Sequence, residues 1–442
     1  MTFQEKIFWL KNSLLRPAAI KQYNEALNNE ALSSEKLADL NFYKRKKIVQ
    51  YAYDNIPFYY TFYNQSGFHP SMFVTEKDWI KIPILDKKMI RENYNELLCR
   101  NLSSKYYKET TTGGSTGVPL KLIIDKRWHS EVLSWRYLRW WGVSPASNIG
   151  IISRGVPKGT WSKLKKYILW WPTKRVYLDA SCMSISDIQD FVIRIKKYKI
   201  EVIQGYVGGI EKVADYIIKN NIIITSVKLV WSSSSPLSKN ARERIQKAFN
   251  CKVMDQYGSC EIASMAVERP LSNSLSINSD YIHLEIVDEY GDLCDENILG
   301  NIIVTNLENY AFPLIRYNIG DKSSLKEKDV TNIFPEIDYV KGRTTDMVIL
   351  PDGSYLDGSY LTTIFDDYTS YIHSFQVIQR ADFSIDINLT KLDHENIESI
   401  LNNVHCVLAE KTKSQVSIRI NIVDHIEDNR GKHRYVISEL AK

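Results

Sequence analysis

Residues 201–255 decide the fold, and they read EVIQGYVGGIEKVADYIIKNNIIITSVKLVWSSSSPLSKNARERIQKAFNCKVMD. Short apolar runs predict strands at 201–204, 227–231 and 252–255. Between them, apolar residues recur at helical spacing from Gly209 to Ile217, and Ser238 is expected to cap a second helix that runs through Phe249. Strand–helix–strand alternation of this kind is typical of a parallel sheet covered by helices.

The same alternation begins further upstream in the chain. Residues 149–153 (IGIIS) predict a buried strand. Ser184 has the character of a helix N-cap, with Asp187 three residues later and apolar positions on one face beyond it. Because ligands of parallel sheets bind at the carboxyl ends of the strands, the loops after Trp231 and Asp255 are the first places to expect a site.

The regions on either side of this core show different patterns of predicted secondary structure. The first hundred residues favour helices, and Pro57 is expected to stop one of them and to leave residues 55–60 extended. Beyond residue 280 the chain predicts short antiparallel strands at 283–287, 301–305 and 313–317. From about residue 346 a small α/β pattern follows, with strands near 347–350, 374–379, 384–389 and 416–422 and a helix through 394–410.

We therefore expect an α/β protein with a large N-terminal domain and a small, mobile C-terminal α+β domain. The large domain should combine a helix-flanked parallel sheet with an antiparallel subdomain. The expected boundaries are 1–342 for the large domain, 343–346 for a hinge, and 347–442 for the small one.

The composition is that of an ordinary globular protein. Of 442 residues, 44% are hydrophobic and 25% charged, and 57 Lys and Arg against 52 Asp and Glu give a net charge of +5. A chain this long exceeds what one hydrophobic core usually supports. The basic residues alternate with acids instead of forming a stripe, so we expect no nucleic-acid partner.

Several function classes are also disfavoured by the sequence. No apolar run approaches the ~20 residues needed to cross a bilayer, and the patch at 7–10 is too short for a secretory signal. No zinc-type spacing is present. The cysteines are scattered and are expected to be reduced thiols of a cytoplasmic protein; they are Cys99, Cys182, Cys251, Cys260, Cys294 and Cys406.

The segment at 110–119, TTTGGSTGVP, is rich in Gly, Ser and Thr. Glycines let backbone N–H groups turn towards an anion, and the hydroxyls add donors, which suits a polyphosphate. It is not a Walker A loop, because Val118 stands where that motif needs Lys. A polar turn before a strand at 120–124 is an equally good interpretation.

Four further motifs follow in the chain. The first, 255–261 (DQYGSCE), offers an aromatic ring for a base and a carboxylate for Mg²⁺. The second, 316–321 (RYNIGD), offers an acid after a glycine turn as an acceptor for ribose hydroxyls. Residues 342–347 (GRTTDM) lie at the domain junction, and 429–435 (NRGKHRY) carries a lysine beside glycine. Taken alone, each is better explained by a turn or a solvated charge.

In this order and pairing, however, the motifs resemble those of adenylate-forming enzymes. Within that superfamily the chain looks like the phenylacetate–CoA ligase and CapK-like branch. Two N-terminal stretches carry the likeness to that branch, 51–59 (YAYDNIPFY) and 82–91 (IPILDKKMIR). The resemblance covers essentially the whole chain and implies an ATP-dependent ligase that activates a carboxylic acid as an acyl-adenylate.

The resemblance also implies roles for individual residues. Tyr257 would stack on adenine, Glu261 would coordinate Mg²⁺, Asp321 would bind the ribose with Arg343 facing it from the hinge, and Lys432 would be the catalytic lysine. Nucleotide contacts are further expected at Ser234, Ser235 and Pro236, and acyl contacts at Tyr206, Gly208 and Gly209. The departing phosphates would be held by Thr112, Gly113, Gly114, Ser115, Thr116 and Gly117.

The chain departs from the family pattern at three positions. Ser235 stands where a Glu is common, Thr345 replaces the first of two hinge acids, and residues 350–353 replace the usual Arg-Gly. The first departure bears on nucleotide contacts and the other two on rotation of the small domain.

The resemblance implies ATP and Mg²⁺ as cofactors, with coenzyme A as one candidate acceptor. It leaves the substrate acid open, and the acceptor is a thiol, an amine, a hydroxyl or a sugar derivative. Surface-polysaccharide biosynthesis is the favoured setting, and a homodimer is a candidate assembly. An ordinary acid–CoA ligase and a non-catalytic adenylate-binding relative are the alternatives.

Overall fold

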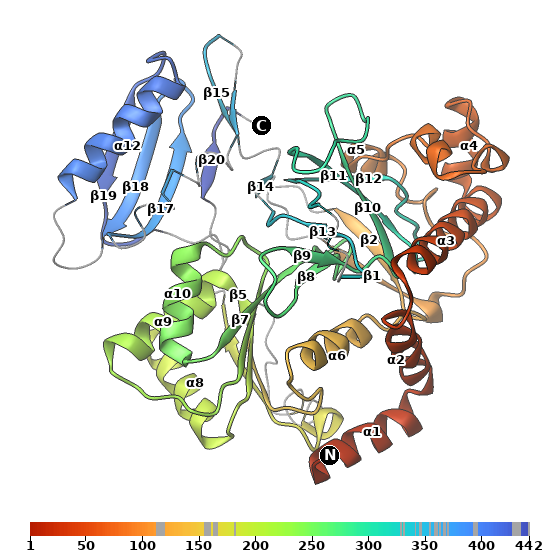
Figure 1. Cartoon of the computed structure of the whole chain (residues 1–442), viewed down its shortest axis with the longest axis horizontal. Helices are drawn as coiled ribbons and strands as arrows, with labels where there is room; N and C mark the ends of the chain where they lie inside the picture. The colour runs from red at the N-terminus through yellow and green to blue at the C-terminus, as the bar shows by residue number, and fades with distance from the viewer. Residues whose placement is uncertain are drawn as a thin grey trace. The chain divides into compact units, whose positions relative to one another are not determined.

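The structure is a computed structural model, and its elements are labelled in Figure 1. Contacts divide the chain into two compact units, the first made of Met1–Pro145 and Gln256–Val340 and the second of Ala146–Asp255 and Lys341–Lys442. The described residues are 1–111, 120–153, 161, 167–180, 183–327, 329, 332–340, 342–343, 347–352, 355–357, 361, 364–365, 368, 371–391, 397–426 and 435–440.

The first unit begins with helices, as predicted. Helix α3 ends at Asn55, because Ile56 before Pro57 adopts an extended conformation (φ −117°, ψ 110°). The expectation of an extended stretch at 55–60 is wrong beyond that point, since Pro57 opens helix α4. Proline suits the first position of a helix, where no partner for an N–H group is needed. The helices of this unit are α1 (Phe3–Leu15), α2 (Pro17–Asn29), α3 (Ser34–Asn55), α4 (Pro57–Gln65), α5 (Lys87–Glu92) and α6 (Glu131–Trp140), with 3₁₀ turns at Pro70–Met72, Glu76–Lys81 and Ser104–Tyr106.

The strands of the first unit are antiparallel. β10, β11 and β12 are neighbours in one sheet, with Ile282 opposite Asn306 at the β10–β11 edge and Val304 opposite Tyr317 at the β11–β12 edge. β1 pairs with β2. The remaining short strands, β8, β9 and β13, lie side by side. The bounds are β1 (Tyr107–Thr111), β2 (Lys121–Asp125), β8 (Ala266–Glu268), β9 (Leu275–Ile277), β10 (Ile282–Val287), β11 (Gly300–Asn306), β12 (Tyr317–Ser323) and β13 (Glu336–Ile337).

The predicted strand at 313–317 is wrong, because β12 starts only at Tyr317. Arg316 has φ +45°, which does not fit a strand. Its buried guanidinium instead donates to Glu285 Oε1 at 3.0 Å and to the carbonyl oxygen of Ile82 at 2.7 Å. Tyr59 accepts from the N–H of Ile315 at 3.1 Å. Contacts distant in sequence therefore override the local pattern here.

The second unit contains the predicted parallel sheet, with strand order β4-β3-β5-β6-β7. Helices α8, α9 and α10 cover it and bury Phe191, Val213 and Phe249 against the strands. Ser184 and Ser238 cap α8 and α10 as predicted, and such caps contribute about 1 kcal/mol each. The elements are β3 (Ile149–Ser153), β4 (Arg175–Asp179), α8 (Ile185–Lys197), β5 (Val202–Tyr206), α9 (Val207–Lys219), β6 (Leu229–Ser233), α10 (Lys239–Phe249) and β7 (Lys252–Tyr257).

The C-terminal part of the second unit forms a sheet of its own, in the order β19-β18-β17-β20. Helix α12 packs on it and contributes Val404 and Leu408 to the core. The α/β prediction with a smaller C-terminal α+β domain is confirmed, whereas the hinge at 343–346 stays a prediction. The elements are β14 (Gly342–Arg343), β15 (Met347–Ile349), β16 (Tyr355–Asp357), β17 (Ile372–Gln379), β18 (Ile385–Lys391), α12 (Glu398–Lys411), β19 (Ile418–Ile422) and β20 (Val436–Ser438).

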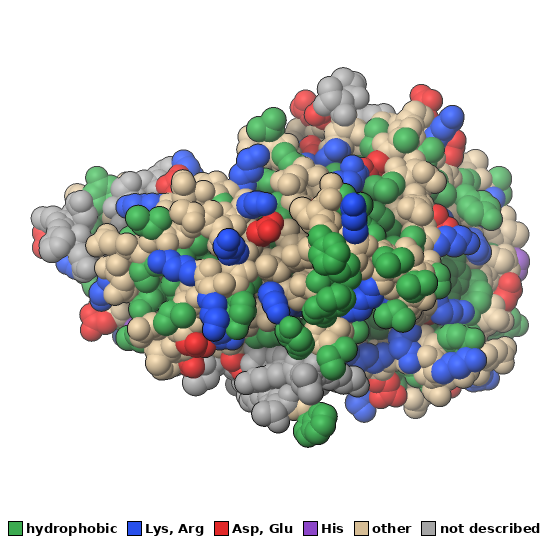
Figure 2. All heavy atoms as spheres, turned by 90° about the horizontal axis from the view of Figure 1, so that it is seen from below, with side chains coloured by type: hydrophobic (Ala, Val, Ile, Leu, Met, Phe, Trp, Pro, Cys, Tyr) green, Lys and Arg blue, Asp and Glu red, His purple; other side chains and the backbone are tan. Residues whose placement is uncertain are grey.

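The surface mixes charge types. On the face drawn in Figure 2, the described Lys and Arg side chains stand among acidic, hydrophobic and uncharged groups. Within the described part of the chain, no helix combines the length and the apolar character that crossing a membrane requires.

Candidate active site

A tight turn in the first unit carries one of the predicted motifs. β7 ends at Tyr257, and residues 258–265 lead into β8. A Cβ atom on Gly258 would lie 2.2 Å from the carbonyl oxygen of Ala263, so only glycine fits there. Ser259 Oγ accepts hydrogen bonds from the N–H groups of Glu261 and Ile262, both at 3.1 Å. The Tyr-Gly-x-x-Glu pattern thus encodes a turn that fixes Glu261 relative to Tyr257.

The structure brings Asp321 to Tyr257, from a motif 64 residues away. The Tyr257 hydroxyl donates a hydrogen bond of 2.8 Å to Asp321 Oδ2. Asp321 is 9% exposed and lies inside β12, so its predicted place in a turn after Gly320 is wrong. Gly320 has φ +80° and donates to Asn318 Oδ1 at 3.0 Å, which lets the strand continue past it.

Glu261 reaches the same strand through a second tyrosine. The Tyr317 hydroxyl donates to Glu261 Oε1 over 3.4 Å, which is long for such a bond. Tyr317 and Asp321 both occupy buried positions in the alternating burial pattern of β12, although the register against β11 shifts between Asn318 and Lys322. Tyr257, Glu261 and Asp321 consequently form one cluster, called here the tyrosine–carboxylate cluster.

The chemistry of this cluster fits a nucleotide. An aromatic ring beside a carboxylate suits a base and the hydroxyls of its sugar. Mg²⁺ is commonly held by one or two carboxylates together with substrate phosphates, and Glu261 is a partly exposed carboxylate of that kind. No group of three or more His, Cys, Asp or Glu is placed to hold a metal among the described residues. A single carboxylate such as Glu261 suits a metal that substrate phosphates also hold.

In the second unit, the predicted nucleotide contacts Ser234, Ser235 and Pro236 follow the end of β6 at Ser233. Ser234 has φ +77°, a left-handed conformation that is unusual for a residue with a side chain. Just before it, Ser232 Oγ donates to Asp255 Oδ1 at 3.1 Å. The loop therefore lies at the carboxyl end of a parallel strand, where the sequence analysis expected ligand contacts.

The predicted acyl contacts start helix α9. Tyr206 is its N-cap residue and is partly exposed, whereas Gly208 and Gly209 are buried. A Cβ atom on Gly209 would lie 2.6 Å from Ile152 Cγ2, so this glycine permits close packing of α9 on β3. Gly208 lines a cavity of about 440 Å³ with Ser238 and Asn240 and with charged groups.

The C-terminal part of the chain matches a known protein family. The family model described as the CapK C-terminal domain matches residues 348–439, which include β17, β18, α12 and β19. Residues 348–439, called here the CapK C-terminal domain, are therefore similar to that family.

The similarity extends beyond the CapK C-terminal domain. The chain is 24% identical over 370 residues to Protein CapK of Staphylococcus aureus, with 81% of this chain and 80% of that one covered. It is 22% identical over 374 residues to a phenylacetate-coenzyme A ligase of Thermus thermophilus, with 81% of each covered. These findings confirm the predicted resemblance to the phenylacetate–CoA ligase and CapK-like branch.

A solved structure shares the fold. It is a 2-hydroxyisobutyryl-CoA ligase in the postadenylation state in complex with R3-HIB-AMP, with a TM-score of 0.72 and 16% sequence identity. The match covers 93% of this chain and 91% of that one. The chain therefore shares its fold with this ligase structure over the matched 93% of its length.

Several predicted site residues lie outside what the structure describes. Lys432, in the CapK C-terminal domain, is one of them. Arg343 belongs to β14, where only its backbone is described. The predicted phosphate loop is also outside, that is Thr112, Gly113, Gly114, Ser115, Thr116 and Gly117.

Two residues that contact the cluster or fix its turn were missed by sequence reasoning. Tyr317 contacts Glu261, and Ser259 fixes the turn that carries Glu261. The alternation of apolar and polar residues through 317–320 (YNIG) signals a strand in the sequence, and a strand running on to 323 would have placed Tyr317 on the same buried side as Asp321. Ser259 follows glycine in a short turn, where serine commonly accepts backbone N–H groups.

Proposed function

We propose that the protein is an ATP-dependent, AMP-forming acid ligase. The observation that carries the proposal is the hydrogen bond of 2.8 Å between Tyr257 and Asp321, with Glu261 beside them through Tyr317. Three residues proposed for base, sugar and metal thus lie together, although Asp321 comes from a different motif than Tyr257 and Glu261. The similarity to CapK and to phenylacetate-coenzyme A ligases supports the same reaction class.

The proposed reaction has two steps. A substrate carboxylate oxygen attacks the α-phosphorus of ATP, an O–P bond forms, and pyrophosphate leaves. An acceptor thiol, amine or hydroxyl then attacks the carbonyl carbon of the acyl-adenylate, loses its proton, and displaces AMP. Both steps depend mainly on positioning and on charge stabilisation.

Each residue of the cluster has a proposed task. The Tyr257 ring stacks on adenine. Asp321 accepts hydrogen bonds from the ribose hydroxyls, and the Tyr257 hydroxyl donates to Asp321 Oδ2. Glu261 would hold Mg²⁺, which when bound neutralises phosphate charge. Ser234, Ser235 and Pro236 are proposed to contact the nucleotide from the end of β6, and Arg343 is proposed to face the ribose.

Lys432 is proposed to act in adenylation, and residues 112–117 to hold the departing phosphates. A positive charge at ~4 Å from the developing negative charge is worth about 4 kcal/mol at an effective dielectric constant of about 20. That corresponds to roughly a thousandfold in rate. Loss of Lys432 should therefore slow adenylation strongly while ATP still binds.

The acceptor and the biological setting are finer proposals. The CapK C-terminal domain and the similarity to Protein CapK support a role in surface-polysaccharide biosynthesis, with an amine, hydroxyl or carrier thiol as acceptor. A second candidate is an acid–CoA ligase, favoured by the similarity to the Thermus thermophilus enzyme. A cytoplasmic location and a homodimer stay predictions.

A pyrophosphate-exchange screen over carboxylic and amino acids tests the reaction class. We expect exchange with at least one acid and a loss of about a thousandfold in Lys432→Ala. A matched control is Lys413→Ala, which removes an exposed lysine of the CapK C-terminal domain that pairs with Asp352 at 3.1 Å. This control should keep full exchange.

Acceptor assays then separate the candidates. AMP release that requires coenzyme A favours the CoA ligase, and release that requires an amine or a sugar derivative favours the polysaccharide role. If no acid in the screen supports exchange while ATP still binds, the protein is a non-catalytic nucleotide-binding relative. Full exchange in Lys432→Ala would remove that lysine from the mechanism.

A further inference from the structure

A fully buried ion pair lies in the first unit, away from the tyrosine–carboxylate cluster. Arg136 of α6 donates to Asp280 Oδ2 at 2.7 Å and to Asp280 Oδ1 at 3.2 Å, and both side chains have no exposed area. The aromatic rings of Trp140, Tyr281 and Phe334 surround the guanidinium at 5.1–5.5 Å. Burying two charges is costly, so such a pair is poor evidence of stabilisation and calls for another role.

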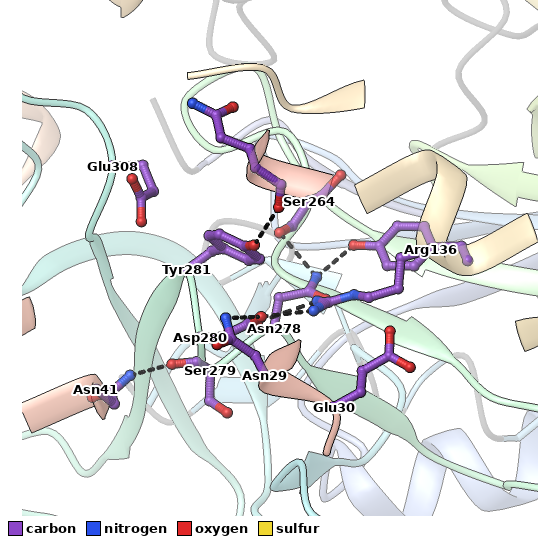
Figure 3. Close-up of polar contacts among 12 residues, drawn as sticks. Asn29, Glu30, Asn41, Arg136, Ser264, Asn278, Ser279, Asp280, Tyr281 and Glu308 are labelled. Carbon is purple, nitrogen blue, oxygen red and sulfur yellow. Dashed lines mark hydrogen bonds and ion pairs between the residues drawn. The ribbon is translucent and has the colours of Figure 1, made fainter. Parts of the chain in front are cut away.

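The pair has a third partner, Asn278, as Figure 3 shows. Arg136 Nη2 donates to Asn278 Oδ1 at 2.6 Å. A guanidinium can only donate, so the amide oxygen of Asn278 must face it and the NH₂ group must point away. The ion pair therefore determines the orientation of the Asn278 amide.

The other side of Asn278 contacts the end of the turn that carries Glu261. Its Nδ2 donates to the carbonyl oxygen of Ser264 at 3.2 Å and to the Tyr137 hydroxyl at 2.5 Å. Its backbone N–H donates to the carbonyl oxygen of Met265 at 2.9 Å. Asn278 thus holds the point where the turn enters β8.

The same turn is closed from its other end by β7. The N–H of Met265 donates to the carbonyl oxygen of Tyr257 at 3.0 Å. Gln256 Nε2 donates to Ser264 Oγ at 3.0 Å and to the carbonyl oxygen of Ala263 at 2.9 Å. With both ends held, residues 258–264 have little freedom to move Glu261 away from Tyr317.

We propose that Asn278, oriented by the Arg136–Asp280 ion pair, is a positioning residue for Glu261. It acts through the turn at 258–264 and does not touch the nucleotide or the metal. This inference rests on the proposed function, because it assigns Glu261 the metal of an ATP-dependent ligase. It adds three residues that none of the sequence motifs contains.

Asn278→Asp separates positioning from simple packing. The substitution keeps the size of the side chain and places a carboxylate oxygen against Arg136, so the contact with the ion pair persists. It replaces the NH₂ group by an acceptor facing the carbonyl oxygen of Ser264, so the side-chain hold on the turn is lost while the backbone bond from residue 278 to Met265 remains.

The first unit offers a matched control. Arg269 Nη1 donates to Asn332 Oδ1 at 2.6 Å, and Asn332 Nδ2 donates to Glu336 Oε1 at 2.8 Å and to Ser276 Oγ at 3.1 Å. Asn332→Asp therefore keeps an arginine contact and removes an amide donor, as Asn278→Asp does. None of these contacts involves the turn at 258–264.

The first readout is hydrogen–deuterium exchange of the whole chain without nucleotide, followed on a peptide that spans residues 256–268. We expect exchange in this peptide to be about tenfold faster in Asn278→Asp than in the native protein and unchanged in Asn332→Asp. Equal exchange in the native protein and Asn278→Asp would overturn the inference. So would a rise of equal size throughout the first unit, which would mean a purely structural role.

The second readout is the Mg²⁺ concentration that gives half-maximal pyrophosphate exchange at saturating ATP. We expect it to rise about tenfold in Asn278→Asp and to stay within about twofold in Asn332→Asp. If the native protein shows no pyrophosphate exchange with any acid, the proposed function fails. The hydrogen–deuterium exchange result alone then still decides whether Asn278 holds the turn.

Arg136→Lys serves as a second variant if Asn278→Asp does not fold. The lysine leaves a positive charge for Asp280 but only one donor group for two partners, Asp280 and Asn278. Arg136→Lys should raise hydrogen–deuterium exchange in the peptide that spans residues 256–268.

Discussion

The two units build their candidate nucleotide and acyl contacts in different ways. In the first unit, Tyr257, Glu261 and Asp321 are joined through hydrogen bonds between side chains. In the second unit, Ser234 and Gly209 are defined by backbone conformation and by close packing at the ends of β6 and β5. The first arrangement should therefore be sensitive to changes in side-chain polarity, and the second to changes in side-chain size.

Within this comparison of the two units, the largest effect is expected at Asp321. Asp321→Ala removes the acceptor of the Tyr257 hydroxyl and the proposed acceptor of the ribose, and hydrogen bonds to charged groups contribute about 1.5–3 kcal/mol each. We expect kcat/KM for ATP to fall about a hundredfold. Tyr257→Phe keeps the ring and should cost about tenfold or less. Steady-state kinetics at varied ATP checks both, and an Asp321→Ala variant with native kcat/KM would exclude Asp321 from the ATP site.

A substitution at Gly209 should lower stability and leave the kinetics unchanged, in contrast to Asp321→Ala. Gly209→Ala places a Cβ atom 2.6 Å from Ile152 Cγ2 in a fully buried contact, and overpacking of this kind costs about 1–3 kcal/mol. We expect a lower urea midpoint with an unchanged KM for the substrate acid.

A double-mutant cycle tests the cause of that loss. Ile152→Ala removes the Cγ2 atom, so Gly209→Ala should cost less in the Ile152→Ala background than in the native protein. A changed KM for the acid at native stability would instead identify Gly209 as a substrate contact.

The parallel half of the fold was predictable because its signals are local. Ser184 and Ser238 stand directly before the helices that they cap, and each strand is a short apolar run. The prediction failed at residues 57–60 and 313–316. There the outcome depends on the ability of Pro57 to start a helix and on the contact of Arg316 with Glu285, 31 residues away.

In the candidate site, too, local features were predictable from the sequence and distant contacts were not. The motifs identified Tyr257, Glu261 and Asp321 by residue type and order, since those features can be read from the sequence. The direct bond between Tyr257 and Asp321 joins residues 64 apart, and Arg136 meets Asn278 across 142. No local pattern encodes contacts at such separations, so the positioning residues could not be found before the fold.

The first unit should also respond to acid through His283. Burial and the nearby Arg45 and Arg316 hold the pKa of His283 well below its usual value. The unfolded chain takes up a proton near pH 6.5 and the folded chain does so only at lower pH. Stability is therefore full above about pH 6.5 and is lost as pH falls, by up to about 1.4 kcal/mol per pH unit.

Urea midpoints measured from pH 7 to pH 5 check this expectation. His283→Gln should flatten the decline on the acid side, because the residue that gains a proton on unfolding is gone. The exposed His69 provides the control, and His69→Gln should leave the decline as it is. An equal decline in native protein and His283→Gln would place the acid sensitivity elsewhere.

The smallest effect is expected at Ser234, and it tests the backbone side of the comparison. Ser234 has φ +77°, which glycine adopts without the steric cost of about 1–2 kcal/mol that a Cβ atom brings. Glycine also gives the unfolded chain more freedom, a cost of about 1 kcal/mol, so Ser234→Gly should change the free energy of unfolding by less than about 1 kcal/mol. If the loop contacts the nucleotide through its backbone, kcat/KM for ATP should also stay within about twofold. A tenfold fall at native stability would show that the hydroxyl group of Ser234 is itself the contact, and the second unit would then depend on side-chain polarity as the first one does.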